Sequence, residues 1–422
     1  MLEIPDGQEH TVFLLGAGFS AERGLPLMDG FVYKMIEANG WLRKAGREEK
    51  SAAIRELLKY RHDISSAALR CAIRPDNIED LLSAAAAEPA GSYSELDRNI
   101  KTAIAATIDY TEKQTPMPRG IGIILDQTDI SSRMLPPSWD MDGHEKINPH
   151  GPKNTAIVPI YDFYVAALTN HLYHGDNGDY TFITYNYDLL LERSLNALGI
   201  PMSYGFTANE IVSENQKGGF ITNNVRWNVP MDSRPSNCVM VLKMHGSINW
   251  SLERTVDNPY LFIKDEYYKG FGECEGFIQP PTWQKRQNSR GGSETDGGLL
   301  SLWSNAIKAL STATKIVVIG YSFPITDYYV KSMFQIGLKN NIGLRKFLVV
   351  NPSLNGEKSK DDYISRMRTI FNEQFMNSGL VEFVPYGLRD VLGRAADQQN
   401  PCNLFSEFNP QSVGRLLPFT SI

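Results

Sequence analysis

Residues 11–20 have the sequence TVFLLGAGFS, in which a short apolar run ends at two closely spaced glycines. Four similar apolar runs, each ending at a turn or a polar cluster, occur at residues 180–184, 239–244, 315–319 and 346–350. Runs of this length that are apolar on both faces and rich in β-branched residues are typical of buried strands in a parallel sheet. The sequence therefore predicts five buried parallel strands.

Helical patterns lie between these strands. Apolar residues recur at i, i+3 and i+4 over residues 299–310, which gives a helix one apolar face. Residues 188–198 show a second helical pattern that stops at Gly199 and Pro201. Because strands and helices alternate, the sequence predicts an α/β fold, a Rossmann-like doubly wound parallel sheet.

The stretch between the first two predicted strands is too long for a single crossover. Residues 31–112 contain helix-rich segments, and the proline-rich residues 113–155 show little periodicity, which predicts a long loop. We therefore predict two parts. Residues 1–30 and 156–422 form the Rossmann-like domain, and residues 31–155 form an inserted helical subdomain with a long loop.

The composition excludes several classes of protein. Of the 422 residues, 42% are apolar and 21% are charged, values typical of a globular protein. The net charge is −6, so no overall positive charge attracts nucleic acid or an anionic membrane. The N-terminus lacks a signal-peptide pattern, and no apolar run approaches the ~18 residues that span a bilayer. We expect a cytoplasmic protein without membrane association or direct nucleic-acid binding.

The sequence shows no strong pattern of metal ligands. The cysteines, which lie far apart, are Cys71, Cys238, Cys274 and Cys402. This spacing argues against a disulfide framework and against structural zinc. His171 and His174 with Asp176 have a metal-like spacing, but they fit the polar end of a helix better, because a metal site needs further ligands and supporting groups. We therefore predict no bound metal.

Ligands of open α/β sheets bind at the carboxyl ends of the strands. The first predicted strand is followed by a G-x-G-x-x-A pattern formed by Gly16, Gly18 and Ala21. Such glycines let the backbone approach a pyrophosphate, and a following helix supplies N–H donors. The same turn can also be purely structural. A dehydrogenase usually adds an acidic residue after a second strand ~20 residues on. Glu37 follows no strand-like run, which disfavours hydride transfer.

Polar residues also follow the next predicted strands. The stretch TYNYD at residues 184–188 contains Asn186 and Asp188, which can bind a ligand. Asp188 can equally cap the following helix, and Asn186 can form a turn. His245 follows the strand at 239–244, where we expect it to meet solvent. A lone histidine at a strand end can also be structural. The last two strands end at Gly320-Tyr-Ser322 and Asn351, which can be ordinary turns.

Together these motifs resemble those of the sirtuin (SIR2) superfamily in order and placement, from residue 11 to about 390. The resemblance implies that Asn186 and Asp188 lie near the nicotinamide and its ribose, and that His245 is the catalytic histidine. It also implies a set of residues that bind the NAD diphosphate or ribose groups: Gly16, Ala17, Gly18, Ser20, Gly320, Ser322 and Asn351.

Two departures from the sirtuin pattern change the expected activity. Protein-deacylating sirtuins carry a four-cysteine zinc module after the His-Gly element, whereas only Cys274 lies nearby here. Pro26 is followed by Leu27-Met-Asp29 instead of Asp-Phe-Arg. The chain is therefore most similar to the zinc-free SIR2-like effectors of bacterial anti-phage defence. This similarity implies an NAD+ hydrolase that cleaves the nicotinamide–ribose bond. Alternatives are an NAD-dependent protein deacylase or ADP-ribosyltransferase, and a non-catalytic NAD or ADP-ribose sensor.

Such an enzyme needs restraint, because constitutive NAD+ hydrolysis would kill its host. We expect control by homo-oligomerisation or by a partner protein. The resemblance suggests a HerA-type ATPase as that partner. NAD is expected as the substrate, without zinc as a cofactor.

Overall fold

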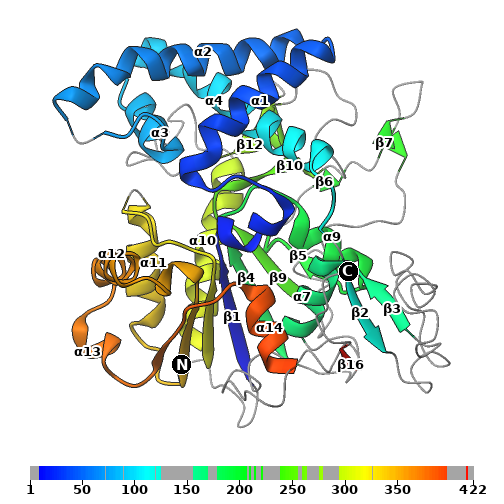
Figure 1. Cartoon of the computed structure of the whole chain (residues 1–422), viewed down its shortest axis with the longest axis vertical. Coiled ribbons are helices and arrows are strands. Elements are labelled where there is room, and N and C mark those ends of the chain that lie inside the picture. The colour runs from blue at the N-terminus through cyan, green and yellow to red at the C-terminus, as the bar shows by residue number, and fades with distance from the viewer. Residues whose placement is uncertain are drawn as a thin grey trace.

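The computed structural model gives the fold of most of the chain (Figure 1). The described residues are 9–71, 73–88, 90–118, 120–124, 155–169, 178–206, 209–210, 213–214, 220–221, 238–254, 259–263, 275–278, 294–325, 327–396 and 415–416. Several residues considered above lie outside this set, namely His171, His174, Asp176, Cys274, Cys402 and most of the predicted loop at 113–155.

A seven-stranded parallel sheet forms the centre of the fold. Its strand order is β15-β14-β13-β1-β4-β9-β5, and all neighbouring strands are parallel. The strands are β1 (His10–Leu15), β4 (Asp179–Thr184), β5 (Met202–Ser203), β9 (Val239–Lys243), β13 (Lys315–Ile319), β14 (Lys346–Val350) and β15 (Val381–Val384). The predicted doubly wound fold is confirmed, and so are all five predicted strands.

The sequence pattern does not predict the two edge strands of this sheet. Strand β5 has only two residues, and three of the four residues of β15 are only partly buried. An edge strand that is short or half-exposed needs no continuous apolar run, so the pattern that predicts buried strands does not detect it.

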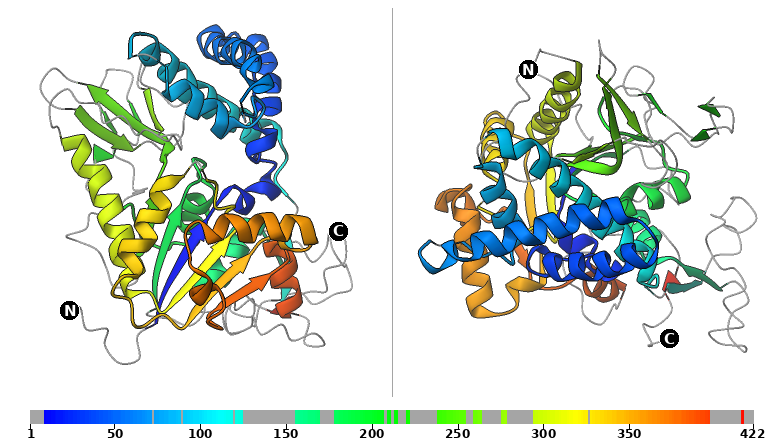
Figure 2. Two further views of the ribbon diagram at one scale, coloured as in Figure 1. Left: turned by 90° about the vertical axis from the view of Figure 1, so that its left-hand side faces the viewer. Right: turned by 90° about the horizontal axis from the view of Figure 1, so that it is seen from above.

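Helices lie on both sides of the sheet (Figures 1 and 2). On one side, α10 (Glu294–Thr312) packs against α11 (Tyr328–Leu338). On the other side lie α7 (Ile160–Thr169), α9 (Leu190–Ala197) and α14 (Leu388–Ala396). Three further helices connect β14 to β15, and they are η6 (Pro352–Leu354), α12 (Glu357–Arg368) and α13 (Glu373–Met376). The helices predicted at 188–198 and 299–310 are confirmed by α9 and α10.

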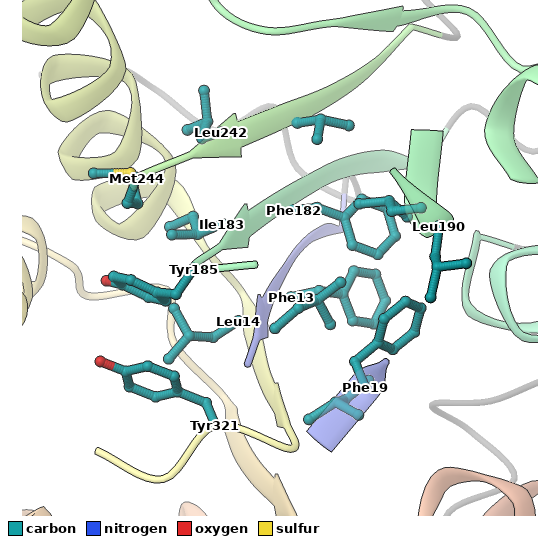
Figure 3. Packing of buried hydrophobic residues seen from close by; sticks show 14 of the residues in the cluster. Phe13, Leu14, Phe19, Phe182, Ile183, Tyr185, Leu190, Leu242, Met244 and Tyr321 are labelled. Carbon is teal, nitrogen blue, oxygen red and sulfur yellow. The ribbon is translucent and has the colours of Figure 1, made fainter. Parts of the chain in front are cut away.

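Aromatic side chains fill the core between the sheet and α7. The rings of Phe13 and Phe182, from neighbouring strands, stack with their centroids 4.7 Å apart. Phe19 packs edge-on against Tyr161 of α7 at 5.6 Å. Figure 3 shows Phe13, Phe182 and Phe19 together, with Tyr185 and Tyr321 beside each other at the strand ends. Burying each such ring stabilises the fold by roughly 1.5–3 kcal/mol.

A layer of helices lies beyond the carboxyl ends of the strands (Figure 1). Its helices are α1 (Phe31–Lys44), α2 (Glu48–Ser65), η4 (Ala67–Leu69), α3 (Ile78–Ala86) and α4 (Ala90–Gln114). Helix α3 begins at Asn77, whose side chain accepts hydrogen bonds from the amides of Glu79 and Asp80. The same Asn77 side chain donates to Asp29 and so ties α3 to the chain that leaves β1. The predicted helix-rich region is confirmed, whereas the division of the chain into domains stays a prediction.

Smaller sheets complete the described fold. Strand β10 (Gly246–Arg254) follows β9 directly and pairs with β11 (Pro259–Ile263) and β12 (Glu275–Ile278), while β6 (Asn209–Glu210) pairs with β11. The other small sheets are formed by β2 (Ile121–Ile124), β3 (Thr155–Val158) and β16 (Arg415–Leu416), and by β7 (Ser213–Glu214) and β8 (Phe220–Ile221). Within the described residues, no helix combines the length and apolar character that crossing a membrane requires.

Candidate functional site

The predicted site residues lie at the ends of adjacent strands. Strand β1 lies between β13 and β4 in the sheet, so the chain order reverses beside β1. This is the switch point at which doubly wound folds bind ligands. Two loops there are central, the glycine loop at residues 16–20 after β1 and the TYNYD loop at residues 184–188 after β4. The loops after β9 and β13 flank them.

The glycine loop packs backbone against backbone on the loop after β13. A Cβ at Gly16 would lie 2.5 Å from Tyr321 Cα, and a Cβ at Gly18 would lie 2.6 Å from Gly320 Cα. The Gly18 amide donates to the Gly320 carbonyl at 2.9 Å, and Gly320 itself has a φ of +61°. These contacts exclude side chains at all three glycines. This backbone packing therefore explains why these positions are glycine, whether or not a ligand binds there.

The glycine loop does not lead straight into an α-helix. It continues as short 3₁₀ turns, η1 (Ala17–Phe19), η2 (Ala21–Arg23) and η3 (Met28–Gly30), and α1 starts only at Phe31. The expected helix N-terminus next to the glycines is therefore absent from this described segment. The amides of Gly16, Gly18, Phe19 and Ser20 all donate to backbone carbonyls, two of them within the loop to Gly16 and Ala17. The role of this loop as a diphosphate cradle stays a prediction.

Side chains of the TYNYD loop meet the glycine loop directly. Ser20 Oγ donates to Asp188 Oδ2 at 2.8 Å, and Asn186 Nδ2 donates to Ser20 Oγ at 3.1 Å. Asn186 Nδ2 also donates to the Gly16 carbonyl at 3.0 Å. Ser20 is buried, whereas Asn186 is half-buried. Residues that are more than 160 positions apart in the chain thus form one hydrogen-bonded cluster, Ser20–Asn186–Asp188.

Asp188 also has the capping role that the sequence suggested as an alternative. Its Oδ1 atom accepts a hydrogen bond from the Leu190 amide at the start of α9. Its backbone carbonyl accepts a hydrogen bond from Lys243 Nζ. Lys243 in turn forms a 2.7 Å ion pair with Glu192, and both side chains are 1% exposed. This buried pair fixes the TYNYD loop to β9, the strand that leads to His245.

His245 is buried, so the expectation that it meets solvent is wrong. The second sheet continues from it through β10, and aromatic rings surround it. Tyr185 contacts the imidazole edge-on at 4.9 Å, and Tyr187 stacks on it at 6.1 Å. These tyrosines flank Asn186 in the chain, so they link His245 to the Ser20–Asn186–Asp188 cluster.

An acidic residue that the sequence analysis missed lies beside His245. Asp327 Oδ2 lies 3.4 Å from His245 Nε2 and accepts a 3.0 Å hydrogen bond from the hydroxyl of Tyr321. The ring of Tyr321 stacks on Tyr185 at 4.6 Å. Burial raises the pKa of the hydroxyls of Tyr185, Tyr187 and Tyr321 well above the usual value. These hydroxyls are therefore neutral at physiological pH. No sequence motif indicated Asp327, which lies seven positions beyond Gly320.

The loop after β13 is held by residues from β14 and α12. The Tyr321 carbonyl accepts hydrogen bonds from Tyr363 Oη at 2.6 Å and from Asn351 Nδ2 at 3.4 Å. The Ser322 carbonyl accepts one from Arg366 Nε at 2.8 Å. Asn351 Oδ1 accepts from the Ser353 amide, so this residue caps η6. Asn351 thus supports the loop, and the predicted ligand contacts of Ser322 and Asn351 stay predictions.

The helical layer contributes a buried carboxylate near the TYNYD loop. Glu112 of α4 accepts a 2.9 Å hydrogen bond from Arg193 of α9. Burial raises the pKa of Glu112, and the nearby charge of Asp188 raises it further, while Arg193 lowers it. No sequence motif marked Glu112. Among the described residues, no group of three or more His, Cys, Asp or Glu residues has the arrangement of a metal site.

Comparison with known proteins supports part of the resemblance drawn from the motifs. The sequence model of the SIR2-like domain family matches residues 180–368, which is less than half of the chain. No curated protein matches the chain. The structure of Sir2Tm bound to a propionylated peptide shares 12% sequence identity, covers 92% of this chain and 93% of that chain, and has a TM-score of 0.33.

Two further solved structures are mutant Sir2 homologues. One, in complex with 2'-O-acetyl ADP ribose, shares 13% identity and covers 87% of this chain and 95% of that chain, with a TM-score of 0.32. The other, in complex with ADP ribose, shares 14% identity. It covers 86% of this chain and 94% of that chain, with a TM-score of 0.31. At these scores the overlap adds nothing to the topology described above. The glycine loop precedes the family match. The chain carries a SIR2-like domain match over residues 180–368, which includes Asn186, Asp188, His245, Gly320, Ser322 and Asn351.

Proposed function

We propose that this protein is an NAD+ hydrolase, which cleaves the bond between nicotinamide and ribose to release nicotinamide and ADP-ribose. The observation that carries the proposal is the Ser20–Asn186–Asp188 cluster, because it joins the glycine loop to the end of β4 at the switch point of the sheet. Buried His245 lies at the end of the next strand, β9, and belongs to the same SIR2-like match as Asn186.

The chemistry needs orientation more than acid catalysis. Nicotinamide leaves as a neutral base when the electron pair of its glycosidic bond moves to the ring nitrogen. Water then bonds to C1' of the ribose and loses a proton, so NAD+ and water give nicotinamide, ADP-ribose and a proton. The enzyme must hold the ribose, place a water on its open face and supply fixed dipoles for the cationic transition state.

Asn186 is suited to placing that water or a ribose hydroxyl. Its Nδ2 group is held by the Gly16 carbonyl and by Ser20 Oγ. Among the described residues, no group donates a hydrogen bond to Asn186 Oδ1, and the side chain is half-buried. A fixed amide thus keeps an acceptor for a ligand hydroxyl. Asp188 holds Ser20 and α9, and in this proposal it orients the nicotinamide end through that network.

His245 is the general base of the proposed reaction. An imidazole has an unperturbed pKa near neutrality, ~6.5, so it can take a proton from water or from a ribose hydroxyl. The surrounding rings of Tyr185 and Tyr187 keep bulk water away from it. No step requires a metal, so a chelator should leave the rate unchanged.

The test is incubation of the purified protein with NAD+, followed by chromatography of nicotinamide and ADP-ribose. Asn186→Ala should lower kcat by about 10²–10³-fold, the cost of one preorganised polar group. His245→Ala should lower it by about 10²–10⁴-fold, the usual contribution of a general base. Matched controls are Asn196→Ala and His62→Ala, whose side chains are exposed. Full activity of Asn186→Ala or of His245→Ala would remove that residue from the mechanism.

The products separate hydrolysis from its rivals. Free ADP-ribose indicates hydrolysis, whereas acetyl-ADP-ribose formed with an acetylated peptide indicates deacylation. ADP-ribose attached to protein indicates an ADP-ribosyltransferase. Intact NAD+ in every reaction, with NAD+ binding retained, indicates a non-catalytic sensor.

The proposal extends to the biological role that the motif resemblance implies. In it the protein is a cytoplasmic effector of anti-phage defence that acts by depleting NAD+. Homo-oligomerisation or a HerA-type ATPase partner restrains the activity. The reactions above, repeated with an added HerA-type ATPase and at several concentrations of this protein, test that restraint. A rate that does not respond to the partner or to protein concentration contradicts it.

A further inference from the structure

We propose that Asp327 is a positioning residue that orients His245 and carries the counter-charge for its protonated form. The inference rests on the proposed function, because it assigns a partner to the proposed general base. Asp327 belongs to none of the motifs found in the sequence. Its described side-chain contacts are with Tyr321 and His245, and not with the Ser20–Asn186–Asp188 cluster.

The geometry brings the carboxylate to the imidazole in a buried place. Asp327 and His245 are each 4% exposed, and Asp327 Oδ2 lies 3.4 Å from His245 Nε2. The Tyr321 hydroxyl donates to the same oxygen atom at 3.0 Å. A buried carboxylate is costly unless charged or hydrogen-bonding groups surround it. The imidazole and the Tyr321 hydroxyl supply that environment on one edge of the carboxylate.

The position of Asp327 before α11 shows that its side chain does not serve as a helix cap. Asp327 is the residue before α11, where aspartate usually accepts a hydrogen bond from an amide of the first helical turn. Here its side chain makes no such capping bond, and its backbone φ and ψ are −90° and 63°. The carboxylate is directed to Tyr321 and His245 instead of to the helix that follows it.

Asp327 is a charged neighbour of His245 in the part of the chain that the structure describes. Tyr185 and Tyr187 come from the TYNYD loop, and Tyr321 comes from the loop after β13. All three hydroxyls are neutral at physiological pH, as described above. Glu79 of α3 is close enough to act electrostatically on Tyr187 and Tyr321. The carboxylate of Asp327, 3.4 Å from His245 Nε2, supplies a negative charge within ion-pair distance.

This arrangement assigns roles to the two imidazole nitrogens. A carboxylate facing Nε2 favours a proton on that atom, so Nδ1 becomes the acceptor in neutral His245. When Nδ1 takes the proton from water or a ribose hydroxyl, the imidazolium faces a carboxylate inside aromatic walls. Attraction between opposite charges is stronger there than in water. Asp327 therefore raises the basicity of His245 and fixes its ring.

The test compares Asp327→Asn with wild type for NAD+ cleavage across pH. The substitution keeps the shape of the side chain and removes its charge. We expect kcat to fall about 10²-fold while KM changes less than about threefold, because positioning acts on the base and not on NAD+ binding. Without the carboxylate the imidazolium is less stable, so the acidic limb of the kcat profile should move to lower pH. Asp327→Glu should recover part of the rate.

The control is Asp361→Asn on α12, whose side chain is exposed. A wild-type rate and an unmoved acidic limb in Asp327→Asn would overturn the proposal. If the wild-type protein does not cleave NAD+ at all, the proposed function fails, and NMR titration of the histidines still decides the inference. The His245 signal is identified by its loss in His245→Gln among the seven histidines. A lower pKa of His245 in Asp327→Asn supports the pairing, and an unchanged pKa rejects it.

Discussion

The glycine loop after β1 and the TYNYD loop after β4 lie side by side at the carboxyl edge of the sheet, but different contacts hold them. The glycine loop is held by its backbone, which packs on Gly320 and Tyr321 too closely for any Cβ. The TYNYD loop is held by side chains, which bond to Ser20, to the start of α9 and to Lys243.

The difference changes how the two motifs support a function. Packing against the loop after β13 accounts for Gly16 and Gly18, so these glycines alone are weak evidence for a bound diphosphate. No such contact accounts for Asn186 Oδ1, which accepts no hydrogen bond among the described residues. The proposed ligand contact therefore depends more on the TYNYD loop, where Asn186 keeps an acceptor atom that a ligand hydroxyl can use.

The largest loss of stability should come from adding one methyl group where the glycine loop packs on the loop after β13. In Gly320→Ala the new Cβ would lie 2.5 Å from the Gly18 backbone, and φ is +61°. We expect a loss of about 3–5 kcal/mol in the free energy of unfolding, because overpacking and positive φ are both unfavourable. Urea unfolding measures this loss.

Gly40→Ala is the matched control for that change. Gly40 lies inside α1, and a Cβ there would meet nothing within 4 Å. The control should gain about 0.5–1 kcal/mol, as expected for alanine inside a helix. A loss below about 1 kcal/mol in Gly320→Ala would show that the two loops can separate, and the glycines would again need a ligand to explain them.

The second effect tests the side-chain support of the TYNYD loop. Lys243→Met leaves Glu192 buried without its cation and removes the bond to the Asp188 carbonyl. Breaking a buried pair in this way costs about 3 kcal/mol, the lower end of the usual range, because the Tyr204 hydroxyl still donates to Glu192. The double variant Lys243→Met, Glu192→Met should be more stable than the single one, because no uncompensated charge remains.

Chemical denaturation of the two variants measures this difference, and Lys308→Met on the exposed face of α10 is the control. That control should change stability by less than about 0.5 kcal/mol. A double variant no more stable than the single one would mean that the Lys243 bond to Asp188, and not the charge balance, holds the loop.

The sequence predicted the regular part of this structure well, because buried parallel strands leave a strong local signal. Strands β1, β4, β9, β13 and β14 are apolar on both faces and end at polar or glycine residues. Their carboxyl ends meet at one edge, so the motif residues after them were expected to gather there. The contact between Ser20, Asn186 and Asp188 fits that expectation.

The rest depends on packing between distant segments, which leaves no local pattern. Asp327 is one aspartate after a loop, and only the fold brings it to His245. Glu112 belongs to a helix of the inserted layer, and Lys243 looks like the polar end of an apolar strand. The burial of His245 was missed for the same reason, since the rings that pack on it, Tyr185 and Tyr187, come from the loop after another strand.

A smaller effect should follow from removing the hydroxyl that joins the two loops. Ser20→Ala deletes a donor to Asp188 and an acceptor for Asn186 in a buried place. We expect a loss of about 1–3 kcal/mol in stability, because buried polar groups lose their partners. The NAD+ cleavage rate should fall with it, since Asn186 loses one of its two anchors.

Exposed Ser359 on α12 provides the control, because Ser359→Ala should change both properties little. For both variants, thermal unfolding measures stability and the chromatographic assay measures the rate of NAD+ cleavage. If Ser20→Ala lost stability but kept the full rate, the Gly16 carbonyl alone would be enough to hold Asn186, and the glycine loop would act on the site through its backbone.

The smallest effect concerns Glu112, which links the helical layer to the TYNYD side of the site. Burial raises its folded pKa above the unfolded value of ~4.3, and Asp188 adds to the rise. Its contribution to stability is therefore full below the unfolded pKa and is lost as the pH rises through the folded pKa. Glu112→Gln stays neutral at every pH. It should match wild type near pH 4 and exceed it at pH 7 to 8, by about 1 kcal/mol.

Thermal unfolding at both pH values measures this difference, with Glu56→Gln on the exposed face of α2 as the control. The competing force is the hydrogen bond from Arg193, which the amide accepts more weakly than the carboxylate does. A variant that is less stable than wild type at neutral pH would mean that the Arg193 pair outweighs the burial of Glu112. The helical layer would then be held to α9 by an ion pair, in the same way that Lys243 holds β9 to α9. Of these three contacts, only that of the glycine loop would depend on backbone packing.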